Sequence, residues 1–372
     1  MTSRRRQIEE LRGLLAKPPS RALFRALLRQ IQRWGGDLSQ APLEYAVGIV
    51  SRWPGSVHRP MPPKWVDLAM RGRAPRAARL CAHLDLSSRA LDDALATTLA
   101  KQPSLSNLSS LRLCGDESAL RAFLTRSTLR SLRRLEFDGA LTDGSVIDLF
   151  EDPVTAGLRV FVLGEGFLTR VAAEAIASSH AAASLERVAL PHNPLGDAGV
   201  CALIEGEALP HLTRLDVSGC GVSLASVHVL AGSPARRRLT HLSLDAAELG
   251  PSFPGVLVDG AAVIPLEHLS INDVALGDAG MDDLIEISMG ELSDLQELRA
   301  THNGITDGGL SGIGSSATFP SMRKLDLRWN RLTWQGADRF SSRRSWRCLE
   351  VAELEGNEIQ VARLQRLSFK RS

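Results

Sequence analysis

The feature that most constrains this chain is a recurring spacing of apolar residues. Residues 185–195 read Leu-x-x-Val-x-Leu-x-x-Asn-x-Leu, and close copies of this pattern return at 295–305, 322–332 and 349–359. Weaker copies begin at Cys81, Leu108, Leu132, Leu158, Leu212, Leu239 and Leu266, so that successive copies start 24 to 29 residues apart and most often 27. Periods of this length indicate a solenoid of stacked structural units, and the spacing predicts eleven of them.

Each copy begins with the pattern of a short strand. Positions four and six of the template are apolar and alternate with other positions, so they face one side of an extended segment. One such strand cannot bury its apolar side alone, whereas stacked neighbours form a parallel sheet over a continuous core. The asparagine at position nine is expected to turn inward and satisfy main-chain groups of the turn. This ladder should be better ordered in the last three repeats than in the first four, where the slot holds Arg89, Asp116, Ala140 and Gly166.

The second half of each repeat has the pattern of a helix. Asp197, Asp278 and Asp307 each stand just before apolar residues at helical spacing, such as Val200 and Leu203. An aspartate in this place is typical of an N-cap, whose carboxylate accepts main-chain N–H bonds from the first turn of its own helix. Each repeat is therefore expected to be a strand followed by a capped helix.

Repeats of 27 residues with a full helix resemble the ribonuclease-inhibitor-like class of leucine-rich repeats, over residues 80–360 or so. The resemblance implies an α/β leucine-rich-repeat solenoid, curved as a horseshoe, with parallel strands inside and helices outside. It also implies binding of proteins, mostly through the concave strand face and its adjacent loops. It does not identify the partner, because function depends on the variable positions of the repeats.

The first 75 residues do not fit the template. Apolar residues at helical spacing predict helices around residues 8–15, 23–31, 42–50 and 65–70. We interpret residues 1–75 as a helical cap on a solenoid of residues 76–372, which ends in a short C-terminal cap within 361–369. Residues 1–80 hold 16 Lys and Arg against five Asp and Glu, whereas residues 81–372 hold 28 against 37. The alternative is therefore a basic docking module for nucleic acid, an acidic protein or an anionic membrane.

The sequence offers little sign of catalysis. It contains no Walker-type phosphate loop, no His-Glu-x-x-His and no Gly-x-Ser-x-Gly. Five scattered cysteines without metal-ligand spacing are typical of reduced thiols, and no apolar run could serve as a secretory signal or membrane span. We expect a cytoplasmic protein that is not an enzyme and that has no cofactor, no bound metal and no small-molecule substrate.

Two histidines occupy the same template position in adjacent repeats. His241 and His268 are expected about one strand spacing apart on the concave face. With Asp245 and Asp273 nearby they would suit a metal ion or a pH-sensitive patch, but we interpret them as solvated surface residues.

Template positions three, five, seven and eight are expected to project toward the concave side and to contact a partner. The candidate binding residues are Arg187, Arg214, His241, His268, Arg299, His302, Lys324, Arg328 and Trp329. An exposed Trp329 beside Arg328 has the composition of a binding hot spot, although this tryptophan could instead fold back onto the edge of the core.

The sequence thus predicts a protein–protein interaction scaffold with a protein partner, ranked ahead of a nucleic acid or a membrane surface. One alternative is a GTPase-activating regulator, since one family with this repeat class uses an exposed loop arginine for that purpose. Among 39 arginines, none can be assigned that role. The other alternative is a nucleic-acid or anionic-surface binder that uses the basic N-terminal region.

Overall fold

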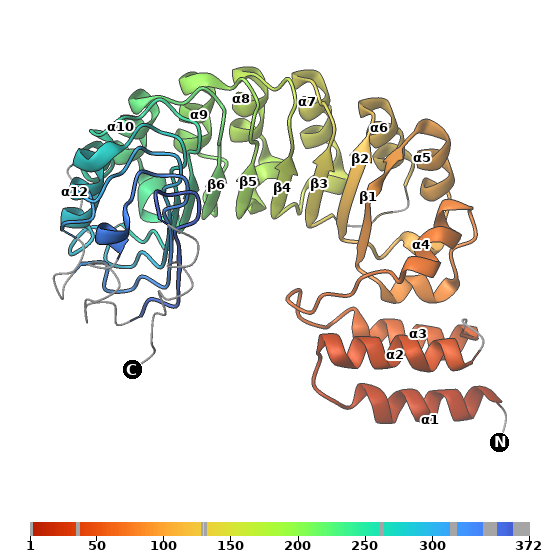
Figure 1. Cartoon of the computed structure of the whole chain (residues 1–372). Helices are drawn as coiled ribbons and strands as arrows, with labels where there is room; N and C mark the ends of the chain where they lie inside the picture. The colour runs from red at the N-terminus through yellow and green to blue at the C-terminus, as the bar shows by residue number, and fades with distance from the viewer. Residues whose placement is uncertain are drawn as a thin grey trace. The chain divides into compact units, whose positions relative to one another are not determined.

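The parallel sheet predicted from the repeats is present. The computed structural model describes residues 3–34, 38–127, 129, 132–259, 264–312, 318–337 and 348–359. Within these ranges eleven strands form one sheet in chain order (Figure 1). They are β1 (His83–Leu91), β2 (Ser110–Gly115), β3 (Arg134–Asp138), β4 (Val160–Leu163), β5 (Arg187–Ala189), β6 (Arg214–Asp216), β7 (His241–Ser243), β8 (His268–Ser270), β9 (Glu297–Arg299), β10 (Lys324–Asp326) and β11 (Val351–Glu353).

Every strand begins at position three of its template copy, so the predicted register is confirmed. In the second half of the chain Arg187 pairs with Arg214, which pairs with His241 and then His268 along the sheet. The residue after each of these is apolar and buried, as in Leu242. Identical template positions are therefore stacked at strand spacing, which places position-three side chains in one row.

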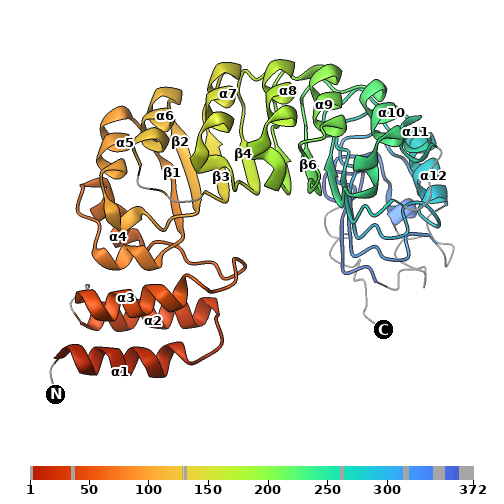
Figure 2. The same cartoon turned by 180° about the vertical axis from the view of Figure 1, so that it is seen from behind.

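A helix follows the strand in most repeats, as predicted. The helices are α5 (Asp93–Ala100), α6 (Glu117–Arg126), α7 (Asp143–Glu151), α8 (Arg170–Ser178), α9 (Gly196–Glu205), α10 (Leu224–Gly232), α11 (Phe253–Val258) and α12 (Gly277–Ile287). Short 3-10 helices η1 (Arg76–Leu80), η2 (Pro103–Leu105), η3 (Pro153–Thr155), η4 (His180–Ser184) and η5 (Pro234–Arg237) complete some turns. Figures 1 and 2 show that the repeat helices lie on one side of the strands that they follow.

The inward-turned asparagines are confirmed. Asn303 is 3% exposed, and its Oδ1 accepts main-chain N–H bonds from Val274 and Leu276 of the preceding repeat at 3.0 and 3.1 Å. Its Nδ2 donates to the carbonyls of Ile271 and Thr301. Each such side chain therefore replaces hydrogen bonds that the buried turn would otherwise lose.

The predicted N-cap role of the aspartates is wrong. Helix α9 has no side-chain cap, and Asp197 instead accepts hydrogen bonds from the main-chain N–H and hydroxyl of Ser223 at 2.8 and 2.6 Å. Asp278 binds Thr306 in the same way in the later repeats. The aspartate lies inside the first turn of its helix rather than before it, so its carboxylate reaches the N-terminus of the next helix. These bonds connect neighbouring repeats.

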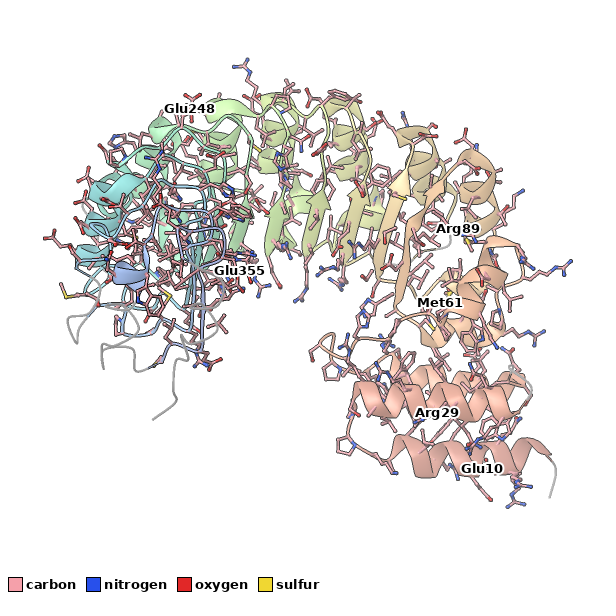
Figure 3. The ribbon with its side chains drawn as sticks, viewed as in Figure 1. Glu10, Arg29, Met61, Arg89, Glu248 and Glu355 are labelled. Atoms are coloured by element: carbon pink, nitrogen blue, oxygen red, sulfur yellow. The ribbon has the colours of Figure 1, made fainter. Side chains whose placement is uncertain are left out.

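The four helices predicted in the N-terminal region are present as α1 (Ser3–Leu15), α2 (Arg21–Arg33), α3 (Gln40–Val50) and α4 (Pro63–Met70). Helices α1, α2 and α3 lie side by side around a core that includes Leu11, Phe24, Leu27, Ile31 and Leu43. Figure 3 shows Glu10 on α1, where it accepts a hydrogen bond from Gln30 of α2.

A short segment between α3 and α4 extends the sheet by one more edge, which the sequence pattern did not reveal. The carbonyl of Arg59 accepts N–H bonds from Ala82 and His83, and the N–H of Met61 binds the carbonyl of His83. Ala82 in turn accepts from Ser109 and Ser110, so residues 59–61 repeat the bonding between successive strands. The capping role of residues 1–75 and the boundary at residue 75 stay predictions.

The chain divides into two compact units. One comprises residues 1–140 and 148–161, and the other comprises residues 141–147 and 162–372. The first contains the N-terminal helices and β1–β3, and the second contains β5–β11 with the candidate binding residues. In the described ranges no helix is both long and apolar enough to cross a membrane. The predicted C-terminal cap at 361–369 lies outside the described residues.

Candidate partner-binding face

The candidate residues of strands β5–β10 lie on one face of the sheet, which we call the strand face. Position three places Arg187, Arg214, His241, His268 and Lys324 in one row, with Glu297 between the last two. Because the strands are parallel and in register, each of these side chains has its neighbour about one strand spacing away. The sheet therefore brings together the position-three part of the set predicted from the sequence.

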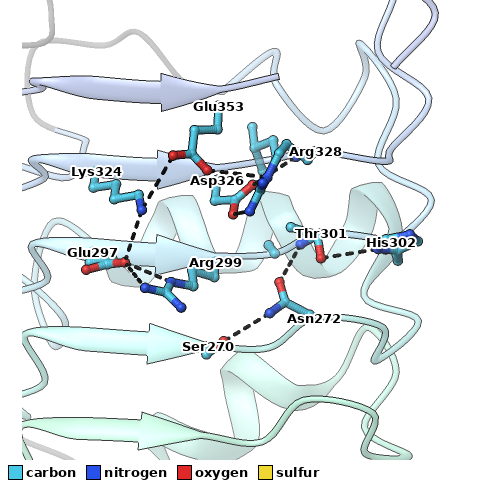
Figure 4. A network of polar contacts seen from close by, with 12 residues as sticks. Ser270, Asn272, Glu297, Arg299, Thr301, His302, Lys324, Asp326, Arg328 and Glu353 are labelled. Atoms are coloured by element: carbon cyan, nitrogen blue, oxygen red, sulfur yellow. Dashed lines mark hydrogen bonds and ion pairs between the residues drawn. The ribbon is translucent and has the colours of Figure 1, made fainter. Parts of the chain in front are cut away.

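The basic residues of the last repeats are neutralised within the chain. Arg299 contacts Glu297 at 2.7 Å, and Lys324 lies 3.8 Å from Glu297 and 3.5 Å from Glu353. Arg328 donates from Nε and Nη2 to both carboxylate oxygens of Asp326 at 2.9 and 2.7 Å (Figure 4). Three of the basic residues predicted to contact a partner, Arg299, Lys324 and Arg328, are thus paired with acidic residues of the same chain.

These contacts change the titration of the acids involved. Burial alone would raise the pKa of Asp326, but hydrogen bonds from Arg328 and the charge of Lys324 hold it below its usual value. Burial likewise opposes ionisation of Glu297, and the contacts with Arg299, Lys324 and His268 lower its pKa overall. Both carboxylates are therefore charged at neutral pH, and the network presents fixed, alternating charges.

Arg187 and Arg214 differ from the paired basic residues of the last repeats. Arg187 is half-buried and Arg214 is exposed, and in the described part of the chain neither makes an ion pair. They are register partners on β5 and β6. This end of the row therefore carries uncompensated positive charge, unlike the end near β9 and β10.

Trp329 is exposed but held in place. Its side chain is 58% exposed, and its ring stacks on His302 with centroids 5.7 Å apart and an interplanar angle of 15°. On the other side the ring lies over Gly356, where an added Cβ would come within 2.5 Å of Trp329 Cδ2. The tryptophan thus covers the glycine of the next repeat and keeps most of its surface accessible, in contrast to the alternative in which it joins the core.

The two histidines predicted to be neighbours are stacked. Their ring centroids are 4.0 Å apart and the interplanar angle is 25°. Burial, His268 and the charges of Arg214 and Arg187 lower the pKa of His241 to about 4. The nearby carboxylates are Glu267 and Glu297, whereas Asp245 accepts hydrogen bonds from Ser270 and Asn272.

Glu297 belongs to this network, although the set predicted from the sequence omitted it. It contacts His268, Arg299 and Lys324 and thereby joins the histidine pair to the charged network. Its template position could have identified it in the sequence. Glu297 is at position three between His268 and Lys324, and an acidic residue in an otherwise basic row is expected to contact its basic neighbours.

Comparison with known proteins agrees with this architecture. The family model described as "Leucine Rich repeat" matches residues 208–230 and 292–314. A ribonuclease inhibitor from Sus scrofa is 33% identical over 149 residues, which is 39% of this chain and 32% of that protein. The chain therefore spans about a third of the length of this curated relative.

A solved structure extends the likeness to most of the chain. Rad7, from the crystal structure of the Rad7 and Elc1 complex in yeast, aligns with a TM-score of 0.54 and 14% sequence identity. The alignment covers 90% of this chain and 93% of that one. At this identity the likeness shows a shared fold.

Proposed function

Because the chain is a leucine-rich-repeat protein of the ribonuclease-inhibitor-like class, we propose that it is an interaction scaffold that binds a protein partner through the strand face and the loops that follow its strands. The observation that carries this proposal is Trp329, an aromatic ring fixed between His302 and Gly356 yet 58% exposed. An immobilised ring loses little conformational freedom when it enters a partner's pocket, and tryptophan and arginine are enriched among residues that dominate binding energy.

The chemistry around Trp329 favours a polar partner with both signs of charge. Arg299, Lys324 and Arg328 are held by Glu297, Asp326 and Glu353, so the face offers alternating charges at fixed positions. Such a pattern selects a complementary arrangement of charges and penalises like-charge contacts. The unpaired Arg187 and Arg214 would attract an acidic segment of the same partner. That Rad7, which shares the fold, was crystallised with Elc1 is consistent with protein binding.

We propose that the protein catalyses no reaction and that it is cytoplasmic. All five cysteines are free thiols, which supports a reducing compartment. The N-terminal helices are proposed to cap the sheet, on the strength of the hydrogen bonds of residues 59–61 with Ala82 and His83.

The test is partner capture followed by affinity measurement with matched variants. Trp329→Ala should weaken binding of the captured partner by about 2 kcal/mol or more, roughly 30-fold, because the anchor ring is lost. The melting temperature should change by only a few degrees, since the ring is largely outside the core. Phe167→Ala removes an aromatic side chain that is 68% exposed elsewhere, and it should leave affinity unchanged. Equal affinities for wild type and Trp329→Ala would overturn the assignment of this face.

A further inference from the structure

His241, Glu267 and His268 form a cluster of groups that bind metal ions in proteins. Each can offer one ligand atom, and these atoms all lie within 4.8 Å of one another. The two histidines come from neighbouring strands in register, and Glu267 directly precedes His268. A single ion could therefore be bound by all three groups once the stacked rings rotate so that their ligand atoms converge.

The hydrogen bonds of His268 leave its Nε2 atom for a ligand. Its Nδ1 lies 3.1 Å from Oε2 of Glu297. A carboxylate oxygen accepts, so Nδ1 of His268 carries the proton and donates it to Glu297. The neutral ring then has its lone pair on Nε2. A carboxylate behind a ligating histidine is the usual arrangement that orients the ring toward a metal.

The contacts of His241 match the same tautomer. Its Nδ1 is 2.9 Å from Oγ1 of Thr240, whose hydroxyl lies 3.3 Å from the carbonyl of Thr213. When the hydroxyl donates its single proton to that carbonyl, its oxygen accepts from Nδ1 of His241. In this arrangement the lone pair of His241 is also on Nε2. Two adjacent imidazoles thus present unprotonated Nε2 atoms from the same row.

The charges around the cluster are mixed. Arg214 and Arg187 lie near His241, and their positive charges disfavour a further positive charge on or beside its ring, including a metal ion. Glu267 supplies a negative ligand, and Glu297 adds a second negative charge behind His268.

We propose that His241, His268 and Glu267 bind one Zn²⁺ ion on the strand face, with Glu297 as a positioning residue for His268. Two imidazole nitrogens and one carboxylate oxygen are a ligand set that zinc accepts in tetrahedral sites, and three protein ligands leave a fourth position for water or a donor atom from outside. From the sequence we considered a metal ion with Asp245 and Asp273 nearby but interpreted the histidines as solvated surface residues, whereas the carboxylates that lie near them are Glu267 and Glu297. The zinc site does not depend on the proposed function.

Titration of the full, reduced chain with ZnCl₂ in a calorimeter at pH 7 tests the site. Wild type should bind one equivalent, and His268→Ala and His241→Ala should each weaken binding by about 10-fold or more. His302→Ala removes a histidine of the same face outside the cluster and should bind as wild type does. Zinc should raise the melting temperature of wild type and of His302→Ala, because only the folded state holds the site, and should not do so for the two ligand variants.

Absorption of the Co²⁺-loaded protein distinguishes this site from the free cysteines. Nitrogen and oxygen ligands give visible bands without the near-ultraviolet thiolate charge-transfer bands that cysteine ligands add. Glu297→Gln should keep the visible spectrum while weakening affinity by about 10-fold, as expected for a residue that orients a ligand. The proposal is overturned if no binding is detected, if His268→Ala and His241→Ala both bind zinc as wild type does, or if thiolate bands dominate.

Discussion

The asparagine ladder allows a stability effect to be worked out from single hydrogen bonds. In Asn303→Ala, the N–H groups of Val274 and Leu276 lose their acceptor, and both lie in the buried turn of the preceding repeat. Leaving a buried donor without a partner costs about 1–3 kcal/mol, so two donors predict a loss of about 2–6 kcal/mol. The carbonyls of Ile271 and Thr301 lose a donor as well. Penetration of water into the turn would place the result toward the lower end of this range.

The matched control is Asn272→Ala, which also removes an asparagine side chain. Asn272 lies on the strand-face side, thirty-one residues before Asn303. Asn272 is half-buried, and its Oδ1 serves one main-chain N–H, that of Thr301. Water can replace that bond, so the loss should be about 1 kcal/mol. Because repeat proteins can unfold locally, hydrogen exchange of the amides at 274 and 276 should accompany denaturant titration. Equal losses for the two variants, or unchanged protection at 274 and 276, would refute the reasoning.

Two further predictions follow from contacts elsewhere. Asp278→Ala should destabilise the chain by about 1.5–3 kcal/mol and expose the Thr306 amide to exchange, whereas Asp294→Ala, an exposed acid, should do neither. Burial and the charges of His58 and Arg59 lower the pKa of His83 to about 4, and among the described residues neither ring nitrogen has a hydrogen-bond partner. A depressed folded-state pKa means that its contribution is complete above pH 6.5 and is lost as the pH falls toward 4. The melting temperature of His83→Phe should therefore fall less than that of wild type over this window, and parallel curves would contradict the assignment.

The register of the sheet could be predicted from the sequence because one period controls it. A shift of one residue would move every buried leucine to the open face, so the template positions of Leu242 and its equivalents leave no alternative. The row from Arg187 to Lys324 follows from the same argument. The pairing of Arg328 with Asp326 depends on side-chain rotamers, which no periodicity encodes.

Two features were missed because their partners are distant in sequence or lack a side-chain pattern. A local rule predicted that Asp197, Asp278 and Asp307 cap their own helices. In the structure Asp197 instead accepts a hydrogen bond from Ser223, 26 residues later. A local rule is blind to a partner that only stacking of repeats brings close. The edge formed by residues 59–61 is held by main-chain hydrogen bonds, which any residue type can make, so it leaves no apolar signature.

The exposure of Trp329, by contrast, can be predicted from the repeat pattern. Position eight adopts left-handed backbone, with φ of +56° at both His302 and Trp329, and its side chain lies over position eight of the next repeat. There Gly356 has no Cβ to collide with the indole ring, and its φ of +74° is one that glycine adopts freely. His192 and Gly219 repeat this combination, since a Cβ on the glycine would fall 2.4 Å from Nδ1 of the histidine. An aromatic ring at position eight, followed one repeat later by glycine, therefore predicts a side chain that packs on the glycine backbone with one face and stays exposed on the other.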